Sequence, residues 1–374
     1  MGENEMLNAC VRFVKKNTVL AIAMAAALIT MCIVPPDAAY AGYLDFKTLT
    51  CLFCVLAVVC ALKNVHFFTF LARKIVQLTG NARMAILALV YITFIGSMLI
   101  ANDMALLTFL PLGYYVLAAT GQMKYLAFTF IMQNIAANLG GMLTPFGNPQ
   151  NLYLYTRFSI PNGEFVSIMW PPFALAVVLI TVCCLFVKGE KLSLARDESP
   201  APPRGRTAIY LLLFALSIVI VFRAIPYWIG LIVIPAALLI LDRKALRQVD
   251  YALLFTFVCF FVFAGNMARI PAVRSFFSAA LEKSTLLMSA ASCQVISNVP
   301  TAILLSQFTD NYRELLWGVN IGGTGTLIAS LASLITFREY TRIYPGRAGY
   351  YIARFSAFNF GFLAVMLLFC QLLR

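Results

Sequence analysis

Long apolar stretches separated by short polar segments dominate the chain. A transmembrane helix needs about 20 consecutive apolar residues, and nine stretches approach or exceed this length. These predicted spans are residues 18–34, 46–62, 124–157, 165–187, 207–222, 226–241, 250–265, 312–337 and 349–372. The pattern therefore predicts an all-α integral membrane protein with about nine spanning helices.

Two further apolar stretches, 82–118 and 284–308, each carry a polar break near the middle. We expect each to form a helical hairpin that enters the membrane and leaves it on the same side. Segments 64–80 and 268–283 place spaced cations among apolar residues, which is typical of amphipathic helices at the membrane interface. The same order of elements therefore occurs twice along the chain: two spans, an interfacial helix, a hairpin and two further spans.

The composition agrees with this interpretation. Apolar residues make up 62% of the chain and charged residues 11%, against about 45–50% and about 25% in soluble proteins. A single His and 15 Asp plus Glu argue against soluble hydrolase or dehydrogenase chemistry. The sequence also lacks the G-x-x-x-x-G-K-[ST] pattern of ATP-binding loops, so that we do not expect an ATP-driven pump. No set of His, Glu and Cys residues indicates catalysis inside the membrane, and we expect neither an enzyme nor a cofactor.

The formal net charge of +13 gains its meaning from the positions of the cations. With a cytoplasmic N-terminus and nine spans, the cytoplasmic segments hold 20 Lys and Arg residues and the outer segments hold 8. Cytoplasmic loops are enriched in Lys and Arg. The charge therefore predicts a multi-pass protein of the plasma (inner) membrane with an outer C-terminus, and not a nucleic-acid partner.

The first apolar stretch allows a second interpretation. Arg12, Lys15 and Lys16 precede it and Ala39-Tyr40-Ala41 follows it, as in a cleaved signal peptide. We favour a retained span, because the internal repeat requires it.

Residues 138–152 align without gaps with residues 320–334. Asn138 matches Asn320, Gly140 and Gly141 match Gly322 and Gly323, Thr144 matches Thr326, and Leu152 matches Leu334. Upstream, the hairpin breaks Ile100-Ala101-Asn102-Asp103 and Ile296-Ser297-Asn298-Val299 also correspond. With the predicted topology the two copies are inverted: residues 1–187 form the first, 226–374 the second, and 188–225 a polar cytoplasmic linker (Lys188 to Arg206) with an unpaired span.

Gly-Gly and Pro inside a spanning helix leave backbone groups without partners, and lipid cannot satisfy them. Paired breaks in inverted repeats indicate a substrate site at the midplane of a secondary transporter. Free helix N-termini suit anions, while exposed carbonyls and polar side chains suit Na⁺. Close helix packing is the alternative role of the four paired glycines. The candidates around the breaks are Asn138, Gly140, Gly141, Ser297, Thr301, Asn320, Gly322, Gly323 and Thr324.

Four segments resemble the ion transporter superfamily, which includes citrate and dicarboxylate carriers, arsenite efflux permeases and some sodium–proton antiporters. They are ANDMALLTFLPL at 101–112, NLGGMLTPFGNPQNLYLY at 138–155, SNVPTAILL at 297–305 and VNIGGTGTLIASLASLI at 319–335. The resemblance covers most of the chain and is strongest to bacterial citrate-transporter-like permeases. It implies two re-entrant hairpins and two unwound helices around a central site, a homodimer, and a transport part that moves as an elevator against a scaffold.

Within this resemblance, Asn102 and Asn298 match the hairpin-tip asparagines that line cation and substrate sites. The resemblance implies Na⁺ at these two residues and at neighbouring backbone carbonyls. The positions that match the unwound helices are Thr144, Gly147, Asn148, Asn151, Thr326, Ser330 and Ser333.

The first hairpin tip departs from the dicarboxylate carriers, which carry Ser-Asn-Thr at both tips. Here it reads Ala101-Asn102-Asp103, which is more similar to arsenite permeases and sodium–proton antiporters. Asp103 is the one acidic residue that we place at membrane depth, where a charge costs at least about 2.5–3.5 kcal/mol on insertion scales. We expect it to couple transport to Na⁺ or H⁺, or else to cap the second hairpin helix.

Two functions follow from these residues. The first is a secondary active transporter of a small anion or oxyanion of the citrate and dicarboxylate class, coupled to Na⁺ or H⁺. The second is an arsenite-type efflux permease or a Na⁺/H⁺ antiporter in which Asp103 binds the ion. In both, the expected partners are a small solute, the lipid bilayer and a second copy of the chain.

Overall fold

The computed structural model describes residues 17–191 and 201–374, and its regular elements within these ranges are all helices. The predicted cytoplasmic N-terminus and the middle of the predicted linker fall in 1–16 and 192–200, outside the described residues. The first half contains α2 (Thr18–Ile33), the 3-10 helix η1 (Ala38–Tyr43), α3 (Phe46–Asn64), α4 (Phe67–Gln77), α5 (Ala82–Ile100), α6 (Asn102–Ala119), η2 (Met123–Tyr125), α7 (Leu126–Gly140), η3 (Gly141–Leu143), α8 (Pro149–Arg157) and α9 (Asn162–Leu185). The second half contains α10 (Arg204–Val221), α11 (Tyr227–Leu241), α12 (Arg243–Gln248), α13 (Tyr251–Arg269), α14 (Pro271–Lys283), α15 (Thr285–Ile296), α16 (Asn298–Leu305), α17 (Tyr312–Ile321), α18 (Leu331–Ile343), η4 (Pro345–Arg347) and α19 (Ala348–Leu372).

Seven helical stretches in the described part of the chain are long and apolar enough to cross a membrane. Six coincide with predicted spans, and the seventh is α5, the first arm of the predicted hairpin at 82–118. Two predicted spans, α2 and α11, are shorter apolar helices of 16 and 15 residues. The span predicted at 312–337 is split into α17 and α18. The all-α membrane architecture is thus confirmed, whereas the number of crossings stays a prediction.

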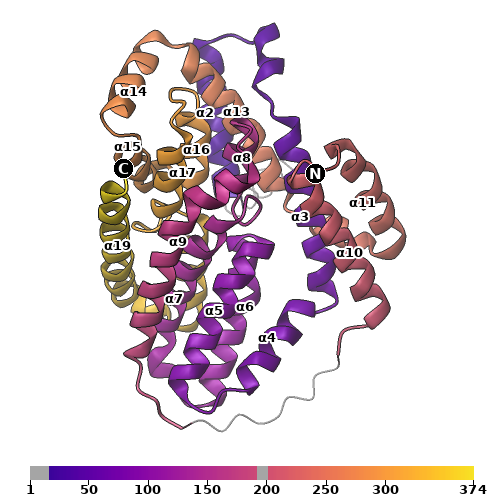
Figure 1. Cartoon of the computed structure of the whole chain (residues 1–374), viewed down its shortest axis with the longest axis vertical. Helices are drawn as coiled ribbons and strands as arrows, with labels where there is room; N and C mark the ends of the chain where they lie inside the picture. The colour runs from indigo at the N-terminus through magenta and orange to yellow at the C-terminus, as the bar shows by residue number, and fades with distance from the viewer. Residues whose placement is uncertain (1–16, 192–200) are drawn as a thin grey trace, which may run out of the picture.

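The helices pack in two groups (Figure 1). In the first group, α3 packs against α10, α11 and α12, and α13 packs against α2. The second group contains both hairpins, the broken helices, α9 and α19, with α5 against α7 and α15 against α17. The short helices α4 and α14, at the two positions predicted to be interfacial, connect one group to the other. Contacts between the groups are fewer, mainly α3 with α8 and α13 with α16.

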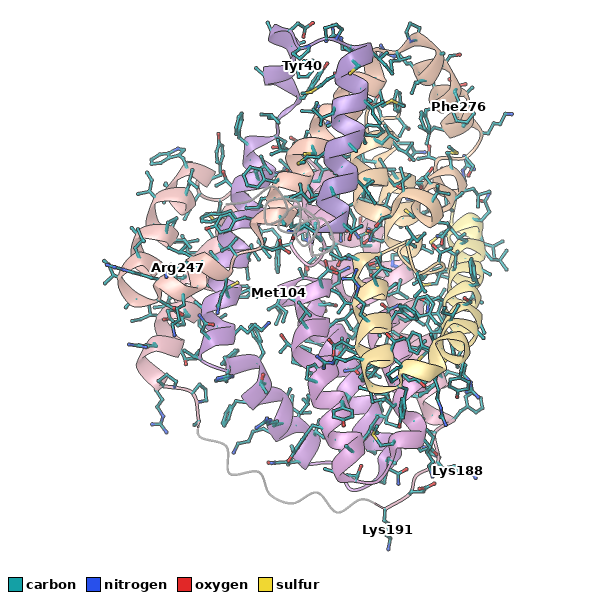
Figure 2. All side chains as sticks on the ribbon, turned by 180° about the vertical axis from the view of Figure 1, so that it is seen from behind. Tyr40, Met104, Lys188, Lys191, Arg247 and Phe276 are labelled. Atoms are coloured by element: carbon teal, nitrogen blue, oxygen red, sulfur yellow. The ribbon has the colours of Figure 1, made fainter. Side chains whose placement is uncertain are left out.

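The two hairpins approach the middle of the molecule from opposite ends (Figure 1). Hairpin 1 consists of α5 and α6, and hairpin 2 of α15 and α16. Figure 2 marks one end by Lys188 and Lys191 and the other by Tyr40 and Phe276, with Met104, beside the tip of hairpin 1, at middle height. The tip of hairpin 1 therefore lies about midway between the two ends of the molecule.

The outer surface is apolar where lipid is expected. Ile240 is 85% exposed and Leu212 71% exposed, which would be costly in water but is favourable in a bilayer. Helices α10 and α11 carry much of this surface. Polar side chains of the broken helices, in contrast, are buried inside the second group.

Candidate functional site

The two hairpin tips share one backbone conformation. Ala101 has φ 64° and ψ 153°, and Ser297 has φ 72° and ψ 160°. This region is nearly restricted to glycine and costs on the order of 1–3 kcal/mol for other residues. The next residue, Asn102 or Asn298, begins a helix, and its Oδ1 accepts the backbone N–H of the following residue at 2.9 Å in both hairpins.

The broken helices also match each other. Helix α7 ends at Gly140 and α8 begins at Pro149, while α17 ends at Ile321 and α18 begins at Leu331. We call the intervening residues 141–148 and 322–330 unwound segment 1 and unwound segment 2. Pro149 suits the first helical position, since it has no N–H to satisfy.

Asn138 and Asn320 link the two halves in reciprocal fashion. Ser330 Oγ donates to Asn138 Oδ1 at 2.8 Å, and Asn148 Nδ2 donates to Asn320 Oδ1 at 3.2 Å. Ser330 and Asn148 each stand directly before a second half-helix, α18 or α8. The first half of each broken helix is therefore hydrogen-bonded to the residue that precedes the second half of the other broken helix.

Hairpin 1 and α8 complete this cluster. Asn102 Nδ2 donates to Asn138 Oδ1 at 3.2 Å. Asn320 Nδ2 donates to Asn151 Oδ1 at 2.6 Å, and Asn151 Nδ2 binds three carbonyl oxygens of unwound segment 1. The structure thus brings the hairpin 1 tip and both unwound segments into one hydrogen-bonded core, which we call the amide cluster. Its members are Asn102, Asn138, Asn148, Asn151, Asn320 and Ser330.

Several buried polar atoms in and beside the amide cluster have no hydrogen-bond partner among the described residues. In native proteins such groups are rare, and at a midplane break they indicate a place for a ligand, an ion or water. They are Asp103 Oδ1, Asn138 Nδ2, Asn148 Oδ1, Gln150 Oε1 and Ser333 Oγ.

Four helix N-termini lie at this junction, those of α6, α8, α16 and α18. Hairpin 2 joins through Asn298, whose N–H donates to the Ala329 carbonyl at 3.0 Å. Helix N-termini carry partial positive charge and free N–H groups, which favours an anion. In the described part of the chain, no Lys, Arg or His side chain hydrogen-bonds to a member of the cluster. Anion binding would thus depend on backbone dipoles, amides and a bound cation.

The four paired glycines differ in the residues that surround them. A methyl group on Gly140 would overlap the Phe94 carbonyl of α5 and lie 2.7 Å from Ser97 Oγ. A methyl group on Gly322 would lie 2.9 Å from Cys293 of α15. These two glycines therefore permit close packing of each broken helix on its own hairpin. Gly323, in contrast, lies beside Asn298 Nδ2 and Asn138 Oδ1.

Gly141 and the remaining candidates of unwound segment 1 support its fold. Gly141 lies against the Asn148 side chain, and Gly147 against the Gly141 carbonyl and Thr144 Oγ1. Thr144 Oγ1 donates to the Met98 carbonyl of α5 at 2.8 Å. These contacts shape the segment, in which Asn148 Oδ1 has no hydrogen-bond partner among the described residues.

The candidates of hairpin 2 and of unwound segment 2 behave similarly. Thr301 Oγ1 donates to the Ser297 carbonyl, and Thr324 Oγ1 to the Ile321 carbonyl. Thr326 Oγ1 donates to the Gln294 carbonyl at 3.0 Å. Ser297 Oγ lies 3.3 Å from the Ala329 carbonyl that also accepts the Asn298 N–H.

Two glutamines near the breaks escaped the sequence analysis. Gln150 Nε2 donates to Asn320 Oδ1 at 3.3 Å, and Gln294 binds the backbone of unwound segment 2. Each of these glutamines places an amide inside an apolar stretch, and this was the signal that could have identified them. Gln294 also lies three residues before a hairpin break. Glu314 is a buried acid that accepts the Leu286 N–H at 3.0 Å and pairs with Arg374 at 2.8 Å.

Two surface cavities lie away from the amide cluster. One of about 410 Å³ lies between α6 and α18, near Tyr114, Glu339 and Arg342. The other, of about 380 Å³, lies near Glu164, Tyr312 and Arg313. Neither contains a residue of the amide cluster.

Known proteins resemble this chain over most of its length. The sequence model of the family described as Citrate transporter matches residues 9–312. An uncharacterised transporter of Methanocaldococcus jannaschii is 31% identical over 295 residues, covering 79% of this chain and 81% of that protein. The inner membrane protein YbiR of Escherichia coli is 30% identical over 288 residues, covering 73% and 74%.

A more distant relative is the silicon efflux transporter LSI3 of Oryza sativa subsp. japonica. It is 26% identical over 164 residues, which cover 43% of this chain and 33% of that protein. The family match covers both hairpins and the first broken helix, and it ends at Tyr312, where α17 begins. The chain is therefore a multi-pass membrane transporter, not an enzyme, and belongs to the citrate transporter family.

Proposed function

We propose that this chain is a secondary active transporter of a small anion or oxyanion, coupled to Na⁺ or H⁺. One observation carries the proposal: four helix N-termini meet at the amide cluster, where several buried polar atoms lack partners. N-termini attract anions, while the amide and carbonyl oxygens around Asn102 and Asn298 suit Na⁺. A bound cation would also offset the negative charge of Asp103.

The division into two helix groups supports an elevator movement. The group with both hairpins and both broken helices would carry the ligand past α2, α3, α10, α11 and α13. The short helices α4 and α14 would act as the connecting arms. In this proposal the two halves are inverted repeats, the N-terminus is cytoplasmic, and a second copy of the chain forms a homodimer.

A second candidate is an efflux permease or Na⁺/H⁺ antiporter in which Asp103 itself holds the ion. The observation in its favour is that Asp103 Oδ1 is buried and has no partner in the described chain. The partial match to a silicon efflux transporter adds weak oxyacids to the substrates worth testing.

A thermal-shift screen of the purified protein separates these candidates. A ligand that binds the folded state raises its apparent stability by mass action. We expect stabilisation by one carboxylate or other small anion, such as citrate, that increases when Na⁺ or a lower pH is supplied. Uptake of that compound into proteoliposomes would then require the matching ion gradient. Stabilisation by arsenite or silicic acid would support the efflux permease. Stabilisation by Na⁺ or Li⁺ alone, together with Na⁺/H⁺ exchange in liposomes, would instead support the antiporter.

A further inference from the structure

Gln294 binds three backbone groups of unwound segment 2 with one side chain. It lies in α15, three residues before the Ser297 tip. Its Nε2 donates to the carbonyl oxygens of Gly322 at 2.9 Å and Thr324 at 3.1 Å. Its Oε1 accepts the Thr326 N–H at 2.9 Å. The side chain therefore replaces hydrogen bonds that the broken helix has lost.

The surrounding backbone adapts to this side chain. Gly325 adopts φ +117° and passes so close to Gln294 that a methyl group there would lie 2.8 Å from the Gln294 Cδ. The Ala329 carbonyl accepts the Asn298 N–H at 3.0 Å. Hairpin 2 and unwound segment 2 are thus one hydrogen-bonded unit.

Hairpin 1 is attached differently. The register that pairs Asn102 with Asn298 pairs Met98 with Gln294. Met98 keeps the backbone contact, since its carbonyl accepts Thr144 Oγ1 at 2.8 Å, just as the Gln294 carbonyl accepts Thr326 Oγ1 at 3.0 Å. However, a thioether has no amide with which to bind the unwound backbone. In the first half that task falls to Asn151, which belongs to α8 and not to the hairpin.

Packing increases the difference between the hairpins. The second arm of hairpin 2, α16, packs against α13 of the other helix group, whereas the corresponding arm of hairpin 1, α6, packs mainly against α4 and α18 besides α5 and α7. Among the described residues, the tip 101–103 bonds outside its own hairpin only through Asn102 to Asn138.

From this asymmetry we infer that Gln294 is a positioning residue that fixes unwound segment 2 onto hairpin 2. These two elements then form the preformed half of the site. Hairpin 1 is the half that moves to admit a ligand. The inference rests on the proposed function for the identity of the site. The rigidity that it assigns to hairpin 2 does not depend on the substrate.

Hydrogen–deuterium exchange on the purified full chain in nanodiscs tests the inference without any ligand. In the unmodified protein, backbone amides at 297–301 should exchange more slowly than those at 101–105. Gln294→Met, which installs the residue found at the matching position of hairpin 1, should speed exchange at 322–330 by about tenfold. Exchange at 141–148 should not change.

Gln133→Met is the matched control. Gln133 is a fully buried glutamine, whereas Gln294 is half-buried. Its Nε2 likewise donates more than one hydrogen bond, to Thr93 Oγ1 and to the Phe109 carbonyl, but Gln133 lies two turns before the break. Gln133→Met should lower the melting temperature at least as much as Gln294→Met without speeding exchange at 322–330. If Gln294→Met does not fold, Thr326→Val should produce a smaller increase at 322–330, because it removes only the bond to the Gln294 carbonyl.

Equal exchange at the two tips of the unmodified protein, or unchanged exchange at 322–330 in Gln294→Met and Thr326→Val, would overturn the inference. A second arm replaces choline chloride with NaCl. We expect Na⁺ to slow exchange at 101–105. If the unmodified protein needs a lower Na⁺ concentration for this protection than Gln294→Met does, the result supports the positioning role. Absence of any Na⁺ effect in both proteins counts against Na⁺ coupling in the proposed function, while the ligand-free exchange still decides the role of Gln294.

Discussion

Adding one methyl group at each of two paired glycines can separate an effect on packing from an effect on ligand binding. In Gly140→Ala the new Cβ would overlap the Phe94 carbonyl and lie 2.7 Å from Ser97 Oγ. Both obstacles belong to α5, and the backbone oxygen cannot move without displacing that helix. Overpacking of this kind costs about 1–3 kcal/mol, so that Gly140→Ala should lower the free energy of unfolding by that amount.

Gly323→Ala places the same methyl group in a more tolerant position. Its Cβ would lie 3.1 Å from Asn298 Nδ2 and 3.2 Å from the Asn320 carbonyl. A side-chain amide can yield by a few tenths of an ångström, and Ala tolerates the negative φ of this glycine, so that stability should fall by less than about 1 kcal/mol. However, the methyl group lies between hairpin 2 and Asn138. One added methyl group in a fitted site changes discrimination by about 10–200-fold, and a comparable loss of ligand affinity is expected.

Two measurements on purified protein distinguish these outcomes. Thermal melts report stability, and the ligand concentration for half-maximal stabilisation reports affinity for the compound found by the screen. Gly140→Ala should lower the melting temperature and leave the ligand affinity unchanged. Gly323→Ala should lower the ligand affinity and change the melting temperature little. The reasoning fails if Gly140→Ala weakens affinity at least as much as Gly323→Ala, since the packing glycine would then belong to the site.

Three further predictions concern charged and polar contacts. Asp103→Asn should abolish ion-driven accumulation in proteoliposomes while the protein stays folded, and full coupled transport by this variant would refute the coupling role. Asn102→Ala and Asn298→Ala should each weaken binding of ligand or Na⁺ by about tenfold, as measured by thermal shift; an effect of only one would contradict a site shared by both hairpins. Arg223 donates to the carbonyl of Tyr155 and lies 4.0 Å from the centre of its ring, so that Arg223→Gln should lower the free energy of unfolding by about 1–2 kcal/mol, and an unchanged melting temperature would show that this contact contributes little.

Sequence patterns predicted the parts of the fold that depend on local chemistry. Both hairpin breaks fall at the expected positions, because Asn102 and Asn298 each begin a helix after a residue with positive φ. The Gly-Gly pairs likewise mark the ends of α7 and α17. A polar residue inside an apolar stretch is a strong signal, since lipid offers it no partner.

The contacts that depend on tertiary structure could not be predicted in this way. Gln294 was overlooked because its partners lie about 30 residues away, in a segment whose path depends on the side chain itself. Glu314 pairs with Arg374 and accepts the Leu286 N–H, and nothing in the local pattern around Glu314 indicates these partners. The bounds of α2 and α11, in contrast, lie within one residue of the predicted ranges 18–34 and 226–241.

The reciprocal bonds of the amide cluster have a consequence for biogenesis. Asn138 and Asn148 are synthesised long before Ser330 and Asn320, the residues of the second half that accept or donate their hydrogen bonds. While the ribosome extends the chain, the first half must therefore wait in the membrane with polar amides that have no final partner. The amide cluster can therefore close only after Ser330 has been synthesised, which places its assembly after the insertion of the first half.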